Sequence, residues 1–191
     1  MRFRILTDKE ITEDRFREFV ELDHTTWPEG DPAYLSTEYL QSLYPDRYEG
    51  LFLAVDPDTD RVAGYFNTVF TDEEHFRKYM NGSFTDLVPV GRTKGQPMIL
   101  YLYAANLYPQ YRGTSCMKEL GAVFAAWLDE LEENGYCFDD VWCETVSRDG
   151  ARTASKGFGM KPVDTDENGF GHWYNGDALR AYRRNMRELA L

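Results

Sequence analysis

The sequence predicts an α/β fold, and three stretches of the chain carry this prediction. Residues 98–108 form a near-continuous apolar run, rich in aromatic and branched side chains, as expected of a strand covered on both faces. Residues 51–55 and 61–70 predict the two strands of a hairpin, joined by a turn of Asp, Pro and Thr. A glycine-containing turn at 110–115 precedes apolar residues at helical spacing: Cys116, Leu120, Val123, Phe124, Trp127, Leu128 and Leu131.

This order of strand, turn and helix places a helix N-terminus at the end of a central strand. The first backbone N–H groups of a helix have no partner within it and carry a partial positive charge, so they favour an anion. Pro109 ends the strand, and the turn itself reads Gln110-Tyr111-Arg112-Gly113-Thr114-Ser115. We therefore expect an anion-binding site at this turn.

The turn resembles a known phosphate-binding loop. Gln110-x-x-Gly113-x-Ser115 is similar to the acyl-CoA pyrophosphate loop, Q/R-x-x-G-x-G/A, of the GCN5-related N-acetyltransferases, the GNAT superfamily. Ser115 replaces the last small residue of that pattern. Serine is nearly as small and is a good helix N-cap, so we expect the loop to survive the replacement.

A second match lies downstream, behind a predicted strand at 141–146. There the superfamily shows N-x-x-A-x-x-x-Y followed by a Gly-Phe pair. In the same register Ala151 falls on the family alanine, Arg152 on a frequent arginine and Gly159 on the glycine, whereas Arg148 replaces the asparagine and Ser155 the tyrosine. The resemblance implies a mixed, mostly antiparallel central sheet flanked by helices, the fold of acyl-CoA N-acyltransferases.

The resemblance also implies a reaction and its site. The reaction is direct transfer of an acetyl group from acetyl-CoA to a primary amine of a small molecule or peptide. Backbone N–H groups near the end of the 98–108 strand would face the thioester carbonyl, each contributing about 3 to 4 kcal/mol. Trp27 and Glu29 become candidate acceptor contacts, with a surface turn and a packed tryptophan as the alternative. The implied coenzyme contacts are Ala105, Asn106, Leu107, Gln110, Tyr111, Arg112, Gly113, Thr114, Ser115, Cys116, Arg148 and Arg152.

The acceptor must attack as the neutral amine, because an ammonium has no lone pair, so a base has to remove a proton. Glu144 is the first candidate, since the 141–146 strand alternates and a glutamate within an apolar strand would be desolvated, which raises its pKa. A glutamate at a strand end or paired with an arginine is the alternative. Tyr101, Tyr103 and His172 are second-rank candidates.

Ser155 stands where much of the superfamily has a tyrosine placed to protonate the departing thiolate. A positioned proton donor contributes about a hundred to ten thousandfold in rate, so its loss could abolish the activity of an enzyme. A thiol with a pKa near 8.5 still leaves tolerably well as the anion. Water, Ser155 itself or a nearby tyrosine would then serve as the donor.

The remaining elements complete one expected domain of residues 1–191. We expect a first strand up to Thr7, helices at about 13–23 and 34–44, a strand at 170–174, and a C-terminal helix at about 177–189. An insertion at about 71–96, with a helical patch at 73–80, would be a substrate lid, a homodimer contact or a long loop.

Composition narrows the classes of partner. A net charge of −12 argues against nucleic acid, which needs clustered Lys and Arg, and an acidic surface suits a cationic acceptor. The chain begins without the apolar core of a signal peptide and lacks an apolar run long enough for a membrane, so we expect a cytoplasmic protein. Three scattered histidines and three cysteines indicate no metal site, and the cysteines are expected to be reduced and mostly buried.

A second class of function stays open. The chain could be a catalytically degenerate fold that binds acyl-CoA, or nothing, and acts as a regulatory interaction module. Arg148 and Ser155, at the two replaced positions, favour this alternative. The near-intact phosphate loop favours the enzyme, because a scaffold has no physical need to keep it.

Overall fold

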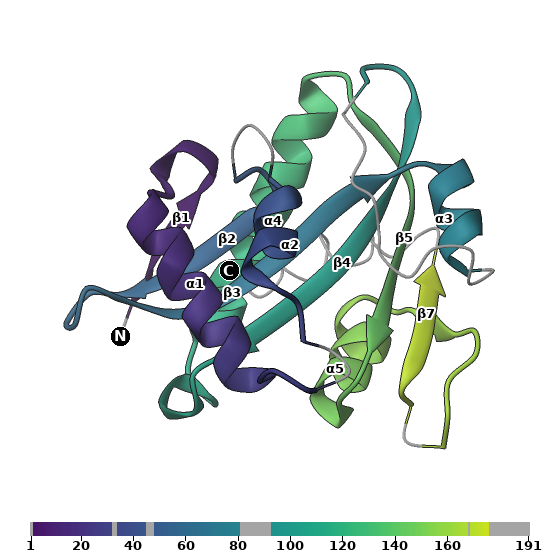
Figure 1. The fold of residues 1–191 in the computed structure, drawn as a ribbon. Helices are drawn as coiled ribbons and strands as arrows, with labels where there is room; N and C mark the ends of the chain where they lie inside the picture. The colour runs from purple at the N-terminus through teal and green to yellow at the C-terminus, as the bar shows by residue number, and fades with distance from the viewer. Residues whose placement is uncertain (1, 32–33, 45–47, 81–92, 168, 176–191) are drawn as a thin grey trace. The chain divides into compact units, whose positions relative to one another are not determined.

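The computed structural model describes residues 2–31, 34–44, 48–80, 93–167 and 169–175 (Figure 1). The expected C-terminal helix at about 177–189 and the middle of the 71–96 insertion lie outside the described residues. The chain divides into two compact units, Met1–Asn67 with Ala104–Phe124, and Thr68–Tyr103 with Ala125–Leu191. Three elements continue from one unit into the other, and the single domain of 1–191 stays a prediction.

The described strands form a mixed sheet of seven strands in the order β1-β2-β3-β4-β5-β7-β6. The β1–β2, β2–β3, β5–β7 and β6–β7 pairs are antiparallel, and β4–β5 is parallel. The expected fold class, a mostly antiparallel sheet flanked by helices, is confirmed. Among the described helices, none combines the length and the apolar character that a bilayer crossing requires.

The first unit is a layer of strands between two layers of helices. It holds β1 (Arg4–Thr7), α1 (Glu13–Thr26), α2 (Thr37–Ser42), β2 (Leu51–Asp56), most of β3 (Arg61–Thr71), the end of β4 (Pro97–Leu107) and the start of α4 (Cys116–Glu133). Tyr65 and Phe66 are neighbours on β3 and point to opposite faces. Phe19 of α1 packs edge-on against Tyr65 at 4.7 Å, and Phe124 of α4 packs against Phe66 at 4.7 Å. The two helices therefore cover opposite faces of this part of the sheet.

The second unit completes the sheet. It holds α3 (Glu73–Met80), β5 (Cys137–Thr145), α5 (Arg148–Arg152), a π-helical turn (Thr153–Gly157), β6 (Lys161–Pro162) and β7 (Gly171–Asn175), together with the start of β4 and the end of α4. Figure 1 shows β7 in yellow-green beside β5. Its aromatic core includes Tyr101 and Trp142, which stack with ring centroids 3.9 Å apart on the parallel pair β4 and β5.

Several element boundaries differ from the sequence-based expectation, among them the end of α1, which runs to Thr26 rather than to about residue 23. The helix expected at 34–44 spans only Thr37–Ser42, because Ser36 accepts a hydrogen bond from the Tyr39 N–H as its N-cap. β5 starts at Cys137 rather than at Val141, so backbone pairing with β4 extends across two aspartates of low strand propensity. The helix after Ser147 widens into a π turn at Thr153, where the Phe158 N–H donates to the Thr153 carbonyl.

Candidate active site

The turn between β4 and α4 is an exposed loop whose base is held by backbone hydrogen bonds. The Tyr108 N–H donates to the Ala63 carbonyl of β3 at 3.0 Å, and the Tyr111 N–H donates to the Tyr108 carbonyl at 2.9 Å. Gly113 has φ +78°, in the left-handed region that favours glycine, and a Cβ built there would meet no atom within 4 Å. The loop backbone therefore faces open space above Gly113, as a cradle for a bulky anion must.

Tyr111 ties this loop to the hairpin of β2 and β3. Its hydroxyl donates to Asp56 Oδ2 at 2.6 Å, and its ring meets Phe3 edge-on at 5.7 Å. The hydrogen bond from Tyr111 holds the pKa of Asp56 below its usual value, and the same bond raises the pKa of Tyr111. Asp56 is therefore a charged acceptor at the base of the loop, a position that the sequence pattern did not single out.

Tyr111→Phe tests this anchor. We expect acetyl-CoA binding to weaken about three- to tenfold, because one hydrogen bond that orders the loop is lost while the ring contact with Phe3 remains. Isothermal titration calorimetry would measure the dissociation constant. Unchanged affinity would show that the loop holds its shape without the Asp56 contact.

The start of α4 accommodates Ser115 without blocking the loop. The Ser115 carbonyl accepts the Glu119 N–H at 2.9 Å, and its hydroxyl donates to Glu119 Oε1 at 2.6 Å. Glu119 Oε2 accepts the Phe3 N–H at 2.8 Å, so the carboxylate is held by the residue before β1 and by the loop. Cys116 is fully buried, and burial, with a smaller effect of Glu119, raises the pKa of its thiol to about 12. The Cys116 thiol is therefore not a group for a ligand, and the Cys116 backbone N–H donates to the Thr114 hydroxyl oxygen at 3.3 Å.

The end of β4 holds the three residues expected at the thioester. Ala105 is exposed and Asn106 is 8% exposed. The Leu107 N–H already donates to Asn106 Oδ1 at 2.9 Å, and Asn106 Nδ2 donates to the Thr26 hydroxyl of α1. The expected use of the Leu107 N–H for a ligand carbonyl would therefore require Asn106 Oδ1 to release it.

The parallel pairing of β4 and β5 stops before either strand ends. Within the described residues, the register runs from Pro97 opposite Cys137 to Leu102 opposite Cys143. β4 continues to Leu107 and β5 to Thr145.

Trp27 and Glu29 lie just beyond the end of α1, in the same unit as the loop. Trp27 is half-buried and donates its N–H to the Asp23 carbonyl at 2.9 Å as the C-cap of the helix. Glu29 is exposed in a turn closed by the Asp31 N–H and the Pro28 carbonyl at 2.9 Å. This geometry fits both the acceptor contact and the packed surface turn.

The other predicted site residues belong to the second unit. Arg148 and Arg152 are exposed at the two ends of α5. Ser155 is half-buried in the π turn and donates its hydroxyl to the Ala151 carbonyl at 2.8 Å, so its proton already has an acceptor. Glu144 is exposed one residue before the end of β5, so the expectation that it is desolvated is wrong. A catalytic role for Glu144 stays a prediction, but desolvation no longer supports it.

A histidine and aspartate pair on the β6–β7 hairpin was not expected as a unit. His172 Nδ1 lies 2.8 Å from Asp164 Oδ1 and 2.9 Å from Oδ2. The sequence analysis named His172 only as a second-rank base and did not single out Asp164. The sequence signal that could have paired them is that Asp164 and His172 flank one short polar segment, residues 165–171.

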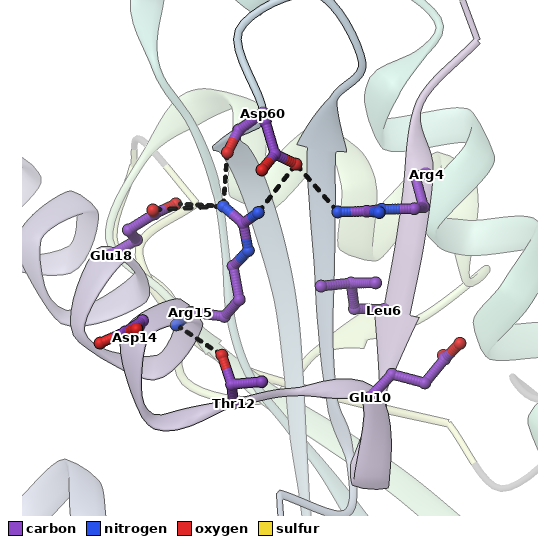
Figure 2. Close-up of a pocket in the computed structure, with 8 residues that line it drawn as sticks. All are labelled: Arg4, Leu6, Glu10, Thr12, Asp14, Arg15, Glu18 and Asp60. Atoms are coloured by element: carbon purple, nitrogen blue, oxygen red, sulfur yellow. Dashed lines mark hydrogen bonds and ion pairs between the residues drawn. The ribbon is translucent and has the colours of Figure 1, made fainter.

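A hollow of about 460 Å³ in the first unit is a separate feature (Figure 2). Arg15 lies within it, 3.1 Å from Glu18 and 2.8 Å from Asp60, and Asp60 also pairs with Arg4 at 3.0 Å. These charges neutralise one another, and none of the predicted site residues lines the hollow. We read it as a surface ion-pair network that joins α1, β1 and the turn between β2 and β3.

No protein-family model matches the sequence, and no curated protein matches it. Solved structures do match. A chain of the NatC complex bound to Gag peptide and CoA is 17% identical, with a TM-score of 0.56 over 91% of this chain and 96% of that chain. Arabidopsis thaliana NAA60 in complex with acetyl-CoA is 13% identical, with a TM-score of 0.58 over 90% of this chain and 97% of that chain.

A mosquito arylalkylamine N-acetyltransferase like 5b is also 13% identical, with a TM-score of 0.57 over 90% of this chain and 99% of that chain. Identities this low establish the fold and not the chemistry. The likeness covers nearly the whole length of each neighbour, and the glycine loop between β4 and α4 lies where the resemblance predicts it. The chain therefore has the fold of the GCN5-related N-acetyltransferases.

Proposed function

We propose that this protein transfers an acetyl group from acetyl-CoA to a primary amine of a small molecule or peptide, by direct attack in a ternary complex. The observation that carries the proposal is the exposed loop at the start of α4, with Gly113 in the left-handed region and no atom within 4 Å of a Cβ built there. Acetyl-CoA would supply the activated acyl group. The structural neighbours, which include enzymes bound to CoA or acetyl-CoA, support the proposal.

The chain's own groups would divide the work as follows. Backbone N–H groups of the loop and of the first turn of α4 would bind the pyrophosphate. The N–H groups of Tyr111, Arg112 and Thr114 donate to loop carbonyls and that of Cys116 donates to the Thr114 hydroxyl, so these four would have to exchange their acceptors for phosphate oxygens. Arg112, Arg148 and Arg152 are exposed cations available to phosphate. Trp27 and Glu29 would contact the acceptor, with the negative Glu29 suited to an ammonium. Glu144 as proton acceptor and Ser155 as proton donor are proposals that Glu144→Gln and Ser155→Ala would test separately.

Gly113→Ala, compared with Gly135→Ala, tests the loop. Both glycines have positive φ, +78° and +87°, and a Cβ on either meets no atom within 4 Å. Each substitution therefore carries a similar backbone strain of about 1 kcal/mol. Only Gly113→Ala should weaken acetyl-CoA binding, because the strained loop would turn its N–H groups away from the phosphates.

The measurement is a thermal-melt titration with acetyl-CoA. In the parent protein a ligand concentration of a hundred times Kd should add about 2.7 kcal/mol of stability, a rise of several degrees. Gly135→Ala should keep this rise and Gly113→Ala should lose most of it. No rise in the parent at millimolar acetyl-CoA would overturn the proposal that the loop binds the coenzyme.

The regulatory interaction module is the second candidate, favoured by Ser155 at the superfamily tyrosine position and by the engagement of its hydroxyl with Ala151. A module should bind acetyl-CoA without turnover, whereas an acetyltransferase should release free thiol in the presence of an amine. A thiol-release assay over a broad panel of primary amines separates the two. Tight binding with no turnover on any amine of the panel would favour the module.

A further inference from the structure

The backbone N–H of Leu107, near the end of β4, points away from β3. The peptide bond between Asn106 and Leu107 is trans and planar, so its N–H points opposite to the Asn106 carbonyl oxygen. That oxygen lies beside Gly64 of β3, only 2.7 Å from the position of a Cβ built there. The next N–H along the chain, that of Tyr108, donates to the Ala63 carbonyl of β3 at 3.0 Å. Successive N–H groups of this extended chain therefore alternate in direction, and the Leu107 N–H faces away from its neighbouring strand.

The side chain of Asn106 supplies the acceptor on that side. Asn106 is buried, and its Oδ1 accepts the Leu107 N–H at 2.9 Å. A buried N–H without an acceptor would cost stability, so this contact does for Leu107 what the Ala63 carbonyl does for Tyr108. The N–H that the family resemblance assigns to the thioester carbonyl is therefore satisfied within the chain itself.

The end of α1 holds the Asn106 carboxamide in one orientation. The Thr26 hydroxyl donates to the Leu22 carbonyl at 3.3 Å, which leaves its oxygen free to accept from Asn106 Nδ2. A carboxamide has one donor end and one acceptor end. With Nδ2 directed at Thr26, Oδ1 is directed at the Leu107 N–H. All of these residues belong to the first unit, and Thr26 is the last residue of α1.

We propose that Asn106 is a positioning residue of the acetyl transfer, and that its carboxamide, held by Thr26, occupies the Leu107 N–H whenever no thioester carbonyl does. This inference rests on the proposed function and on a thioester that lies at the end of β4. The carbonyl of acetyl-CoA displaces Asn106 Oδ1 from the N–H. After the transfer, Asn106 Oδ1 returns to the N–H while CoA is still bound.

This exchange affects which form of the coenzyme the protein prefers. The hydrogen bond gained by the thioester carbonyl is offset by the one that Asn106 loses. A ligand without the carbonyl leaves the Asn106 contact intact, so it buries no unpaired N–H. Asn106 therefore brings the affinities for the acylated and the free coenzyme closer together than the thioester contact alone would make them.

The first experiment compares acetyl-CoA with S-ethyl-CoA, which has the same number of carbon atoms and no carbonyl. Isothermal titration calorimetry would give the dissociation constant of each ligand. In Asn106→Ala the Leu107 N–H has no competitor, so the ratio of the S-ethyl-CoA constant to the acetyl-CoA constant should rise about three- to tenfold above that of the parent protein. A purely structural role of Asn106 would change both constants by the same factor.

A matched pair of substitutions tests the part that Thr26 plays. Thr26→Val keeps the shape of the side chain and removes the oxygen that accepts from Asn106 Nδ2. The carboxamide is then held less firmly, so the ligand ratio should rise about twofold or more. Thr26→Ser keeps the hydroxyl and should keep the ratio of the parent protein.

Amide hydrogen exchange measured by NMR gives a readout that does not depend on activity. In the free protein, Asn106→Ala should speed exchange at Leu107 about three- to tenfold, the loss expected for one hydrogen bond. The Tyr108 amide, which is bonded to Ala63, should keep its rate and so report that the end of β4 is intact. Acetyl-CoA should slow the Leu107 amide of the variant more than S-ethyl-CoA does.

The outcomes separate this inference from the proposed function. An unchanged ligand ratio in Asn106→Ala, equal ratios in Thr26→Val and Thr26→Ser, or faster exchange at Tyr108 as well as at Leu107 would each overturn the role of Asn106. All three leave acetyl transfer intact, because thiol release in the presence of a primary amine tests it independently. Failure of the parent protein to bind either ligand would overturn the coenzyme site and this inference together.

Discussion

Gly64→Ala should lower the free energy of unfolding by about 3 kcal/mol and abolish most of the acetyl-CoA thermal shift. A Cβ at Gly64 would lie 2.1 Å from Leu107 Cδ2 and 2.7 Å from the Asn106 carbonyl oxygen. The leucine side chain can rotate, but the carbonyl belongs to the backbone of β4. The strand would have to move at Asn106 and Leu107, where we propose that the thioester lies. Urea denaturation and the acetyl-CoA melt titration would measure the two effects.

Gly157→Ala is the matched control for this substitution. Its Cβ would meet Thr153 Cγ2 at 3.6 Å, an ordinary van der Waals distance, and its φ lies outside the left-handed region. It should change stability by no more than about 1 kcal/mol. Equal stability of Gly64→Ala and Gly157→Ala would show that β3 and β4 are not in close contact at Gly64.

Tyr65→Phe should destabilise the protein by about 3 kcal/mol at pH 7, because it leaves a buried carboxylate without its donor. Asp23 is 2% exposed and Tyr65 is fully buried, and the Tyr65 hydroxyl donates to Asp23 Oδ1. Asp23 Oδ2 has no hydrogen-bond partner in the described part of the chain. The variant keeps the ring that packs against Phe19, so the loss reports the hydrogen bond and not the packing.

The effect of Tyr65→Phe should depend on pH. Burial raises the pKa of Asp23 above the usual value of 3.8, and the hydrogen bond from Tyr65 and the charge of His24 partly oppose this. A carboxyl with a raised pKa in the folded state contributes most stability below pH 3.8, and that contribution is lost as the pH rises through the folded pKa. Removing the Tyr65 donor raises the pKa of Asp23 further, so the total loss of stability should be larger and should extend to higher pH.

Urea denaturation from pH 3.5 upward would measure this dependence. Asp23→Asn removes the titrating group while keeping an oxygen that can accept from Tyr65, so it should flatten this part of the pH profile. A Tyr65→Phe profile parallel to that of the parent protein would show that the two side chains are not coupled.

Much of the fold could be predicted because its signals are local. The apolar run of β4, the glycine turn and the three-to-four spacing of α4 follow one another directly in the sequence. The structure places β4 at Pro97–Leu107 and α4 at Cys116–Glu133. The hairpin of β2 and β3 was read from its turn residues. Backbone geometry within such elements depends on neighbouring residues, so a single sequence is enough to predict it.

In the candidate site, the positions of the loop residues could be predicted from the sequence, but the surroundings of Glu144 and Ser155 could not, because they depend on packing. The loop residues came from a contiguous pattern, and all of them lie on the turn and the helix start where they were expected. Glu144 was expected to be desolvated from the alternation of its own strand, but exposure depends on what packs over a strand end. Ser155 was considered as a proton donor, and its hydroxyl is bound to a carbonyl of its own helix.

The sequence by itself determined the strand, loop and helix that suit a phosphate, because periodicity and turn chemistry are written in consecutive residues. Only the tertiary structure decided which distant groups meet: Asp56 with Tyr111, Gly64 with Leu107, and Asp164 with His172. Those contacts depend on strand register and on the packing of side chains from separate elements. No local pattern specifies such pairings, since a shift of one residue in register would turn each side chain to the other face.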